Sequence, residues 1–139
     1  MDNNFVVLEN EFFKVKMVQV SKEGFDLVYN GSEVIGHLDF SVDKIDDEVL
    51  HMTYDFRREY VKFVYLREAL YLMADYFFNE LDFVRVICHV DIQHLHIAEI
   101  FKEFGFMVLK NDEKGFLLKL GANYFNVEIL NSSKPFTCF

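Results

Sequence analysis

The chain has 139 residues, of which 52% are hydrophobic and 17% aromatic, and this apolar content excludes a disordered chain. The length predicts a single domain with one core, over residues 1–130, followed by a tail over 131–139. The formal net charge of −9 argues against a nucleic-acid partner and favours basic partners such as small amines or Lys-rich peptides.

Targeting signals and cysteines bear on location. The N-terminal residues carry neither a basic region nor a hydrophobic segment, and no apolar run approaches the roughly 18 residues that a membrane span needs. Cys88 and Cys138 are far apart, Cys88 in a predicted buried strand and Cys138 in the tail. A disulfide scaffold is not expected, and we predict a cytoplasmic protein with no membrane partner.

The first half of the chain has the patterns of β-strands. Residues 12–20 alternate, with Val15 and Met17 on one face, and a turn over 21–24 follows. Asn30-Gly31 between two apolar runs indicates a hairpin, because both residues accept a positive φ angle. The predicted strands span 25–29, 34–40 and 48–56, with a polar, acidic loop over 43–47, and they form an antiparallel meander.

The second half changes to a helical period. Apolar residues recur at helical spacing over 61–81, and again from Ile97 to Phe104, where Gly105 is placed to end the helix. Residues 84–90 carry apolar side chains on both faces, as a central strand does. Strands are predicted over 106–109, 116–120 and 124–130. The element order favours the α/β class, with a mixed sheet covered by helices.

This order and the local sequence resemble the GNAT superfamily of acetyl-CoA-dependent N-acetyltransferases. The resemblance is carried by Glu68-Ala69-Leu70, by Tyr76-Phe77-Phe78, and by the stretches 81–91 and 100–106. The hairpin over 25–40 is similar to the second and third strands of the family. The likeness covers roughly residues 25–120. It implies a GNAT-like mixed, mostly antiparallel sheet flanked by helices, and transfer of an acetyl group from acetyl-CoA to an amine.

The resemblance also implies where acetyl-CoA would bind. In the family, the backbone amides of a loop with the motif Q/R-x-x-G-x-G/A hold the pyrophosphate at a helix start. That motif falls on residues 61–66, and the family's CoA-contacting Asn falls on His94. The implied cofactor-binding residues are Phe56, Lys62, Phe63, Val64, Tyr65, Leu66, Arg67 and His94.

The chain departs from the family pattern at several of these positions. Val61, Val64 and Leu66 replace the specified loop residues, and Phe101 stands where many members have a general-acid tyrosine. Branched side chains are expected to crowd the pyrophosphate position, while Lys62 and Arg67 keep positive charge nearby. The chain before Phe25 is too short for the pair of N-terminal helices that help to bind the acceptor in the family.

Candidate catalytic residues lie on the predicted strand 48–56. Period-two alternation puts His51 and Asp55 on one face and Glu48 on the other. We interpret His51 and Asp55 as the candidates for a general base that takes a proton from an amine. The alternative is that both are ordinary polar strand residues.

A second polar cluster comprises His89, Asp91, His94 and His96. Imidazole and carboxylate groups bind Zn²⁺, but side chains two apart on a helix diverge, so we interpret the cluster as a solvated loop and predict no metal site. The neighbouring Arg57-Arg58-Glu59 is interpreted as a turn with local ion pairs.

Two functional hypotheses follow. The first is an N-acetyltransferase in which acetyl-CoA binds where the strand ends near Phe56 and the helix starts near Val61. The second is a member of the same fold that no longer uses acetyl-CoA and acts as a binding or regulatory module, through a homo-oligomer or a basic partner. The combined departures at Val61, Val64, Leu66, His94 and Phe101 motivate the second hypothesis.

Overall fold

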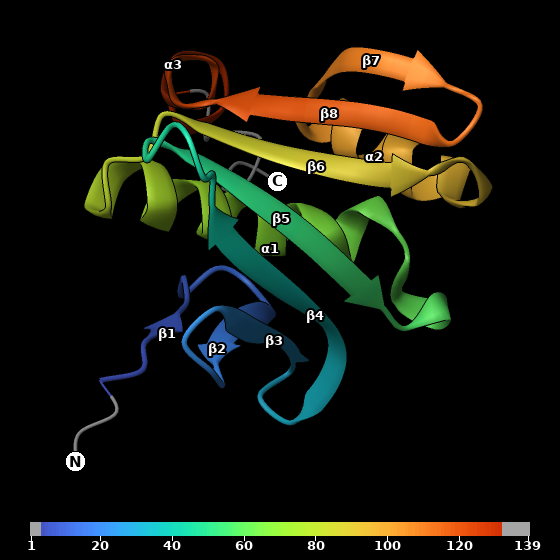
Figure 1. Cartoon of the computed structure of the whole chain (residues 1–139). Helices are drawn as coiled ribbons and strands as arrows, with labels where there is room; N and C mark the ends of the chain where they lie inside the picture. Colours follow the sequence, from blue (N-terminus) through green and yellow to red (C-terminus); the bar gives the residue numbers. More distant parts are fainter. Residues whose placement is uncertain (1–3, 132–139) are drawn as a thin grey trace.

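A computed structural model describes residues 4–131 as one eight-stranded sheet with helices on one of its faces (Figure 1). Its strands are β1 (Val7–Leu8), β2 (Val15–Gln19), β3 (Gly24–Tyr29), β4 (Glu33–Val42), β5 (Val49–Phe56), β6 (Arg85–Asp91), β7 (Met107–Asp112) and β8 (Gly115–Gly121). Their spatial order is β1-β2-β3-β4-β5-β6-β8-β7. The α/β class and the mixed, mostly antiparallel sheet are confirmed.

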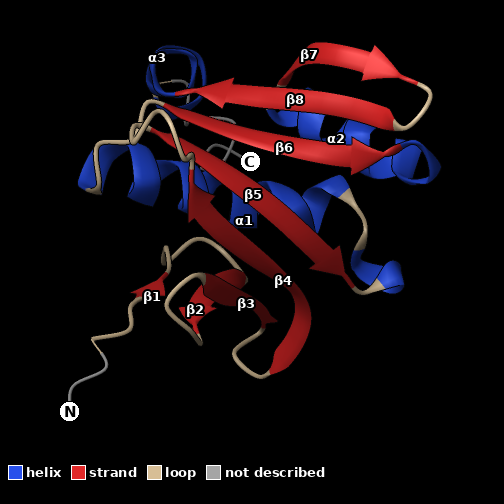
Figure 2. Cartoon of the chain, viewed as in Figure 1, coloured by secondary structure: helices blue, strands red, loops and turns tan. Residues whose placement is uncertain are grey.

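The helical elements follow β5, β6 and β8 along the chain (Figure 2). They are η1 (Arg58–Tyr60), α1 (Phe63–Ala74), the π-helical η2 (Asp75–Glu80), η3 (Ile92–His94), α2 (Leu95–Phe104), α3 (Ala122–Tyr124) and the π-helical η4 (Phe125–Leu130). In the described chain, residues 4–57 form strands and loops without a helix, and β2 and β3 are joined by a turn at 20–23. The tail predicted over 131–139 lies outside the described residues except for Asn131, as does Cys138, and the domain boundary at residue 130 stays a prediction.

The N-terminal meander forms because its side chains alternate between core and solvent. Val15 and Met17 are buried, as are Phe25 and Leu27 on the paired strand. Asn30 and Gly31 have φ angles of 51° and 81°, which confirms the predicted hairpin. One face of this meander therefore packs on the helices, and the other face is open.

Strands β5 and β6 are the one parallel pair of the described sheet, and α1 with η2 forms the crossover between them. Val86, Cys88 and Val90 are buried, and β6 lies between β5 and β8, so the predicted central strand is confirmed. The helix predicted over 61–81 is confirmed as α1 followed by η2. Burial raises the pKa of the Cys88 thiol, which therefore remains protonated at neutral pH.

Helix α2 ends where the sequence indicated. Gly105 has a φ of 141°, and the amide of Phe106 donates to the carbonyl of Phe101, as in a Schellman motif. Phe106 is buried and its ring stacks on Phe101 at 5.2 Å between centroids. This cap turns the chain from the helix layer back into β7, which lies at the edge of the sheet.

The prediction of a strand over 124–130 is wrong, because these residues are helical in α3 and η4. Phe125 and Ile129 are the buried residues, and their spacing of four places them on one helical face. The Phe125 ring contacts Tyr71 and Phe78, at 5.5 and 5.9 Å between centroids. The end of the described chain therefore adds a third helical segment beside α1 instead of another strand.

Candidate active site

A gap opens in the sheet between the second halves of β5 and β6. The pairing of these strands runs from Val49 and Arg85 to Met52 and Cys88 and stops there. Strand β5 remains paired with β4 as far as Phe56, while β6 stays paired with β8. Among the described residues, the edge of β5 over 53–56 therefore has no strand partner on its β6 side.

The Tyr54 side chain crosses this gap. Its hydroxyl lies 2.7 Å from Nδ1 of His94, which belongs to η3 at the end of β6. The Tyr54 ring also meets Phe101 of α2 edge-on at 5.9 Å and stacks on Phe56 at 5.3 Å. Burial raises the pKa of Tyr54 to about 12, so its phenol stays protonated at neutral pH.

A second contact joins the two sides of the gap beyond the end of β5. Nε2 of His96, in the first turn of α2, lies 3.2 Å from the carbonyl oxygen of Val61, in the loop before α1. Asp91 fixes the approach to α2, because its carboxylate accepts the amide of Gln93 at 2.8 Å and caps η3. The two histidines therefore hold the start of α2 against both β5 and the loop that follows it.

The start of α1 offers backbone donors beside this gap. The amides of Tyr65 and Leu66 donate to the carbonyl of Lys62, whereas those of Phe63 and Val64 have no acceptor among the described residues. Lys62 is exposed at the N-cap position and has no side-chain capping bond. Two unpaired amides at a helix start attract an anion.

The other predicted cofactor-binding residues at the start of α1 differ in burial. Val64 is exposed at 53%, while Leu66 is 1% exposed and lies in the core, so Leu66 does not face the loop surface. Tyr65 packs edge-on against Tyr29 and Tyr60, at 5.1 and 5.0 Å between centroids. Arg67 lies half-buried in the first turns of α1. Crowding at the helix start is thus confined to Val61 and Val64.

Glu68 and Glu33 anchor the helix and loop to the meander. Oε1 of Glu68 accepts two hydrogen bonds, from the amides of Lys14 at 2.9 Å and Val15 at 3.0 Å. Glu33 accepts from the Tyr60 hydroxyl at 2.8 Å and from Nη1 of Arg57 at 3.2 Å. The predicted turn is present as η1, but Arg57 pairs with Glu33 on β4, 24 residues earlier, and not with a neighbour in the turn.

The structure does not bring His51 and Asp55 together. Both lie on the open face of β5, but they are four residues apart, which is about 13 Å along a strand. Nε2 of His51 lies 2.6 Å from Oδ1 of Asp43. The bonds from His51 and from the amides of Asp46 and Ile45 lower the pKa of Asp43 to about 2. His51 pairs with Ile87, one residue before the gap opens.

The polar cluster after β6 is dispersed. His89 and Asp91 point out from the exposed side of β6, His94 contacts Tyr54, and His96 contacts the loop before α1. Over residues 4–131, no group of three or more His, Cys, Asp or Glu side chains is arranged to hold a metal ion. In the same range, no helix has the length and apolar character required to cross a membrane.

The sequence interpretation missed Tyr54 and Asp43. Tyr54 shares the core face of β5 with Met52 and Phe56, and a hydroxyl on such a face signals a polar partner. That signal was available from the alternation. The pairing of Asp43 with His51 depends on how the loop before β5 folds back, and no pattern in the sequence reports it.

Comparison with known proteins agrees with this geometry. The family model described as the acetyltransferase (GNAT) domain matches residues 9–107. No curated protein sequence matches the chain. The N-terminal domain of a ribosomal-protein-alanine acetyltransferase from Clostridium acetobutylicum has a similar fold, with a TM-score of 0.69 and 16% identity over 87% of this chain and 99% of that one.

Two further solved structures share the fold at low identity. The first is a GNAT-family acetyltransferase from Bacillus anthracis, with a TM-score of 0.61 and 14% identity over 73% of this chain and 67% of that one. The second is a dodecameric spermidine N-acetyltransferase from Vibrio cholerae, with a TM-score of 0.63 and 13% identity over 76% and 68%. The extent of the family match, together with the divided sheet and the crossover helix, shows that the chain belongs to the GNAT acetyltransferase family.

Proposed function

We propose that the protein transfers the acetyl group of acetyl-CoA to an amine. The observation that carries this proposal is the gap between β5 and β6, whose unpaired β5 edge leads directly to the start of α1. Backbone groups along such an edge bind an extended chain such as pantetheine by hydrogen bonds. Acetyl-CoA supplies an acetyl group that is activated as a thioester.

The donors present at the start of α1 fit a diphosphate. The free amides of Phe63 and Val64 point out of the helix start, and the exposed Lys62 adds a positive charge. These donors are backbone groups, so they do not depend on the glycines that the loop lacks. We assign the diphosphate to this helix start and the pantetheine arm to the edge of β5 near Phe56.

The open face beside the gap supports His51 as the general base. Asp43 accepts from the imidazole and orients it, and the low pKa of Asp43 keeps that carboxylate charged. An imidazole held by a carboxylate can take a proton from a substrate ammonium before attack, or from the amine as it attacks the thioester. His51 lies nearer to the point where the strands separate, and Asp55 is the second candidate for the same role.

Charge supports a basic acceptor. The net charge of −9 attracts cations, and Asp26, Asp39 and Asp55 add carboxylates to the open face. Solved structures of similar fold are named as acetyltransferases of spermidine and of ribosomal-protein alanine. We therefore propose a small amine or a basic peptide as acceptor, in the cytoplasm, and a homo-oligomer as the working form.

A thermal-shift titration with acetyl-CoA tests the proposal. A ligand at 100 times its Kd stabilises the folded state by about 2.7 kcal/mol, which gives a clear rise in Tm. S-acetyl-pantetheine, which lacks the diphosphate, should give a smaller rise at equal concentration. Turnover is then measured as thiol release with a panel of polyamines and Lys-rich peptides.

A matched pair of variants locates the diphosphate. Val64→Asp adds a carboxylate at the exposed helix start, where it suits the helix dipole but repels the diphosphate. Val127→Asp changes a residue of similar exposure, 55%, on the distant η4. Acetyl-CoA binding should be lost in Val64→Asp and kept in Val127→Asp. Equal binding by both variants would contradict the assignment.

One observation favours the second hypothesis, a module of this fold that does not use acetyl-CoA. The Tyr54–His94 contact occupies the gap, and at the helix start Val64 stands at the position of a family glycine and Val61 at that of the family Gln or Arg. No Tm rise with acetyl-CoA, together with self-association or capture of a Lys-rich peptide, would support that hypothesis over acetyl transfer.

A further inference from the structure

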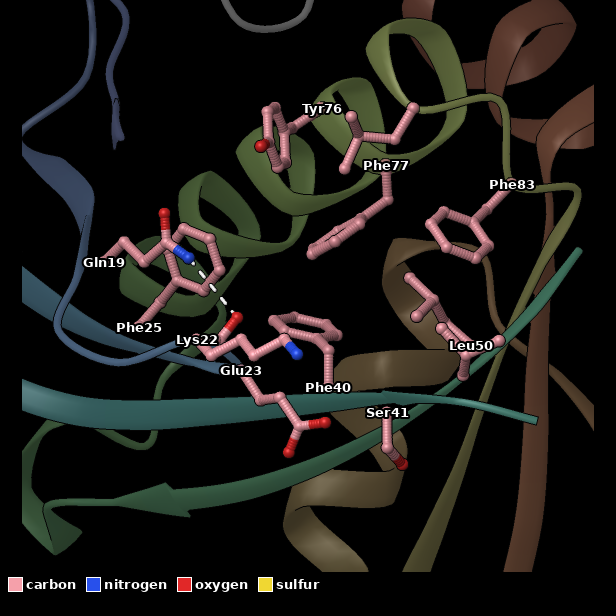
Figure 3. Close-up of a pocket in the computed structure, with 12 residues that line it drawn as sticks. Gln19, Lys22, Glu23, Phe25, Phe40, Ser41, Leu50, Tyr76, Phe77 and Phe83 are labelled. Carbon is pink, nitrogen blue, oxygen red and sulfur yellow. Dashed lines mark hydrogen bonds between the residues drawn. The ribbon is translucent and has the colours of Figure 1, made fainter. Parts of the chain in front are cut away.

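A cavity of about 240 Å³ lies at the other end of the helix layer from the gap. It opens between the β2–β3 turn, the second half of β4, the start of β5 and the segment that ends η2 (Figure 3). Phe77 at this cavity is fourteen residues beyond Phe63 at the start of α1, which is about 21 Å along a helix. The cavity is therefore separate from the proposed acetyl-CoA site.

Aromatic rings form the interior of the cavity. The Phe25, Phe40 and Phe77 rings contact one another, with centroid separations of 4.4 Å for Phe40 and Phe77 and 5.9 Å for Phe25 and Phe40. Tyr76 and Phe83 extend the ring cluster on either side, at 6.3 Å from Phe25 and 6.0 Å from Phe77. Faces and edges of several rings around one cavity suit a flat aromatic group.

The backbone of η2 and of the next residues brings these side chains to one place. The helix changes from α to π hydrogen bonding at Asp75, and Asp82 adopts a left-handed conformation with a φ of 63°. The amide of Leu81 donates to Tyr76 and that of Phe83 to Phe77, at 3.1 and 2.9 Å. Leu81 and Phe83, on either side of Asp82, both line the cavity. Such interruptions are enriched at ligand sites.

The mouth of the cavity carries two polar donors. Lys22 and Ser41 line it together with Gln19 and Glu23, and neither the Lys22 nor the Ser41 side chain has a hydrogen bond or ion pair within residues 4–131. The Lys22 side chain extends toward the Phe40 ring, whereas the neighbouring Glu23 carboxylate points away from the ring cluster (Figure 3). An ammonium and a hydroxyl beside an apolar interior suit a carboxylate attached to an apolar body.

We propose that this cavity binds a compact aryl carboxylate, with the ring among the phenylalanines and the carboxylate at Lys22 and Ser41. The volume equals that of about eight water molecules at roughly 30 Å³ each, which suits a phenyl ring with a short chain whose carboxylate lies at the open mouth. A nucleotide or the whole of acetyl-CoA is too large for it. The site is independent of acetyl transfer.

Three probes of similar size that share a phenyl ring and differ in charge test the site: phenylacetate, phenylacetamide and phenethylamine. Each is titrated into the full ¹⁵N-labelled protein, and the amide shifts are followed by NMR. Phenylacetate should bind most tightly and shift the amides of Phe77, Leu81 and Phe83. Saturation with acetyl-CoA should not displace it. A preference for phenethylamine, shifts confined to other regions, or no shifts with any probe would overturn the proposal.

The adjacent charged residues of the turn provide a matched pair of variants. Lys22→Gln should weaken phenylacetate about threefold, as expected for a solvent-accessible ion pair, and leave phenylacetamide unchanged. Glu23→Gln should not weaken phenylacetate. Both residues are exposed, so the fold should be retained in each variant. Equal affinity of phenylacetate for Lys22→Gln and the unmodified protein would refute the role of the carboxylate.

Discussion

The Tyr54–His94 contact spans the gap where we place the pantetheine arm, so we expect its removal to weaken the free protein and to spare the state with acetyl-CoA bound. Tyr54→Phe deletes one hydrogen bond of 2.7 Å and keeps the ring contacts with Phe56 and Phe101. His94 is exposed, so its Nδ1 regains a water molecule and no buried group is left unpaired. The net loss is then about 1 kcal/mol, the usual contribution of one hydrogen bond.

The stability that Tyr54→Phe loses in the free protein should reappear as tighter binding of acetyl-CoA. If the gap must open to admit acetyl-CoA, a closed state weakened by about 1 kcal/mol gives a Kd about fivefold lower. Denaturant unfolding measures the loss in the free protein, and calorimetric titration measures the gain in affinity. Tyr60→Phe is the control, because its hydroxyl bonds to Glu33 outside the gap and should change stability alone. Weaker or unchanged binding by Tyr54→Phe would refute the reasoning.

Three further predictions concern side chains whose partners are known. Glu68→Ala removes both contacts with the amides of Lys14 and Val15 at the start of β2 and should lower the free energy of unfolding by about 2 kcal/mol, a Tm fall of roughly 6 °C. His51→Gln should reduce kcat by about 100-fold with unchanged acetyl-CoA binding, measured by thiol release and calorimetry. His37→Asn should cost stability at pH about 5.5 and little at pH about 8.5, measured by denaturant unfolding.

The sign of the His37 effect follows from its surroundings. Burial lowers the pKa of His37, but hydrogen bonds and charges from Asp26 and Asp39 outweigh it and leave the pKa raised. A raised pKa stabilises the fold below the unfolded value of about 6.5, and this stabilisation is lost as pH rises through the folded value. A larger cost of His37→Asn at high pH would contradict this assignment.

The other two predictions have their own controls. Glu59 is exposed, and Glu59→Ala should leave Tm unchanged. Asp55→Asn should retain most of the rate if His51 is the base. A rate loss in Asp55→Asn that matches the loss in His51→Gln would instead assign the chemistry to both residues.

Local patterns were sufficient to predict most of the fold. Alternation located β2 to β6, and Asn30-Gly31 and Gly105 marked turns where a positive φ is required. The failure at 124–130 has a clear physical cause. Phe125, Val127 and Ile129 satisfy a period of two, while Phe125 and Ile129 also satisfy a spacing of four, and packing against α1 decided between them.

The candidate site was less predictable, because its contacts join distant parts of the chain. Tyr54 and His94 are forty residues apart, and His96 reaches back thirty-five residues to Val61. Leu66 looked like an obstruction in the loop, but a helix that begins at Phe63 turns it into the core. Spacing along one element reports a shared face, whereas side chains from two elements meet only through the tertiary fold.

The parallel pairing of β5 with β6 has a consequence for how the protein folds. It comprises four residue pairs and requires the whole segment 57–84 to cross over, whereas β2 to β5 are joined by short connections. Closing that long loop is entropically costly, so the pairing should form after the hairpins and be among the first to open. Native-state hydrogen exchange should therefore divide the sheet at this line, with one cooperative unit before the crossover and another after it.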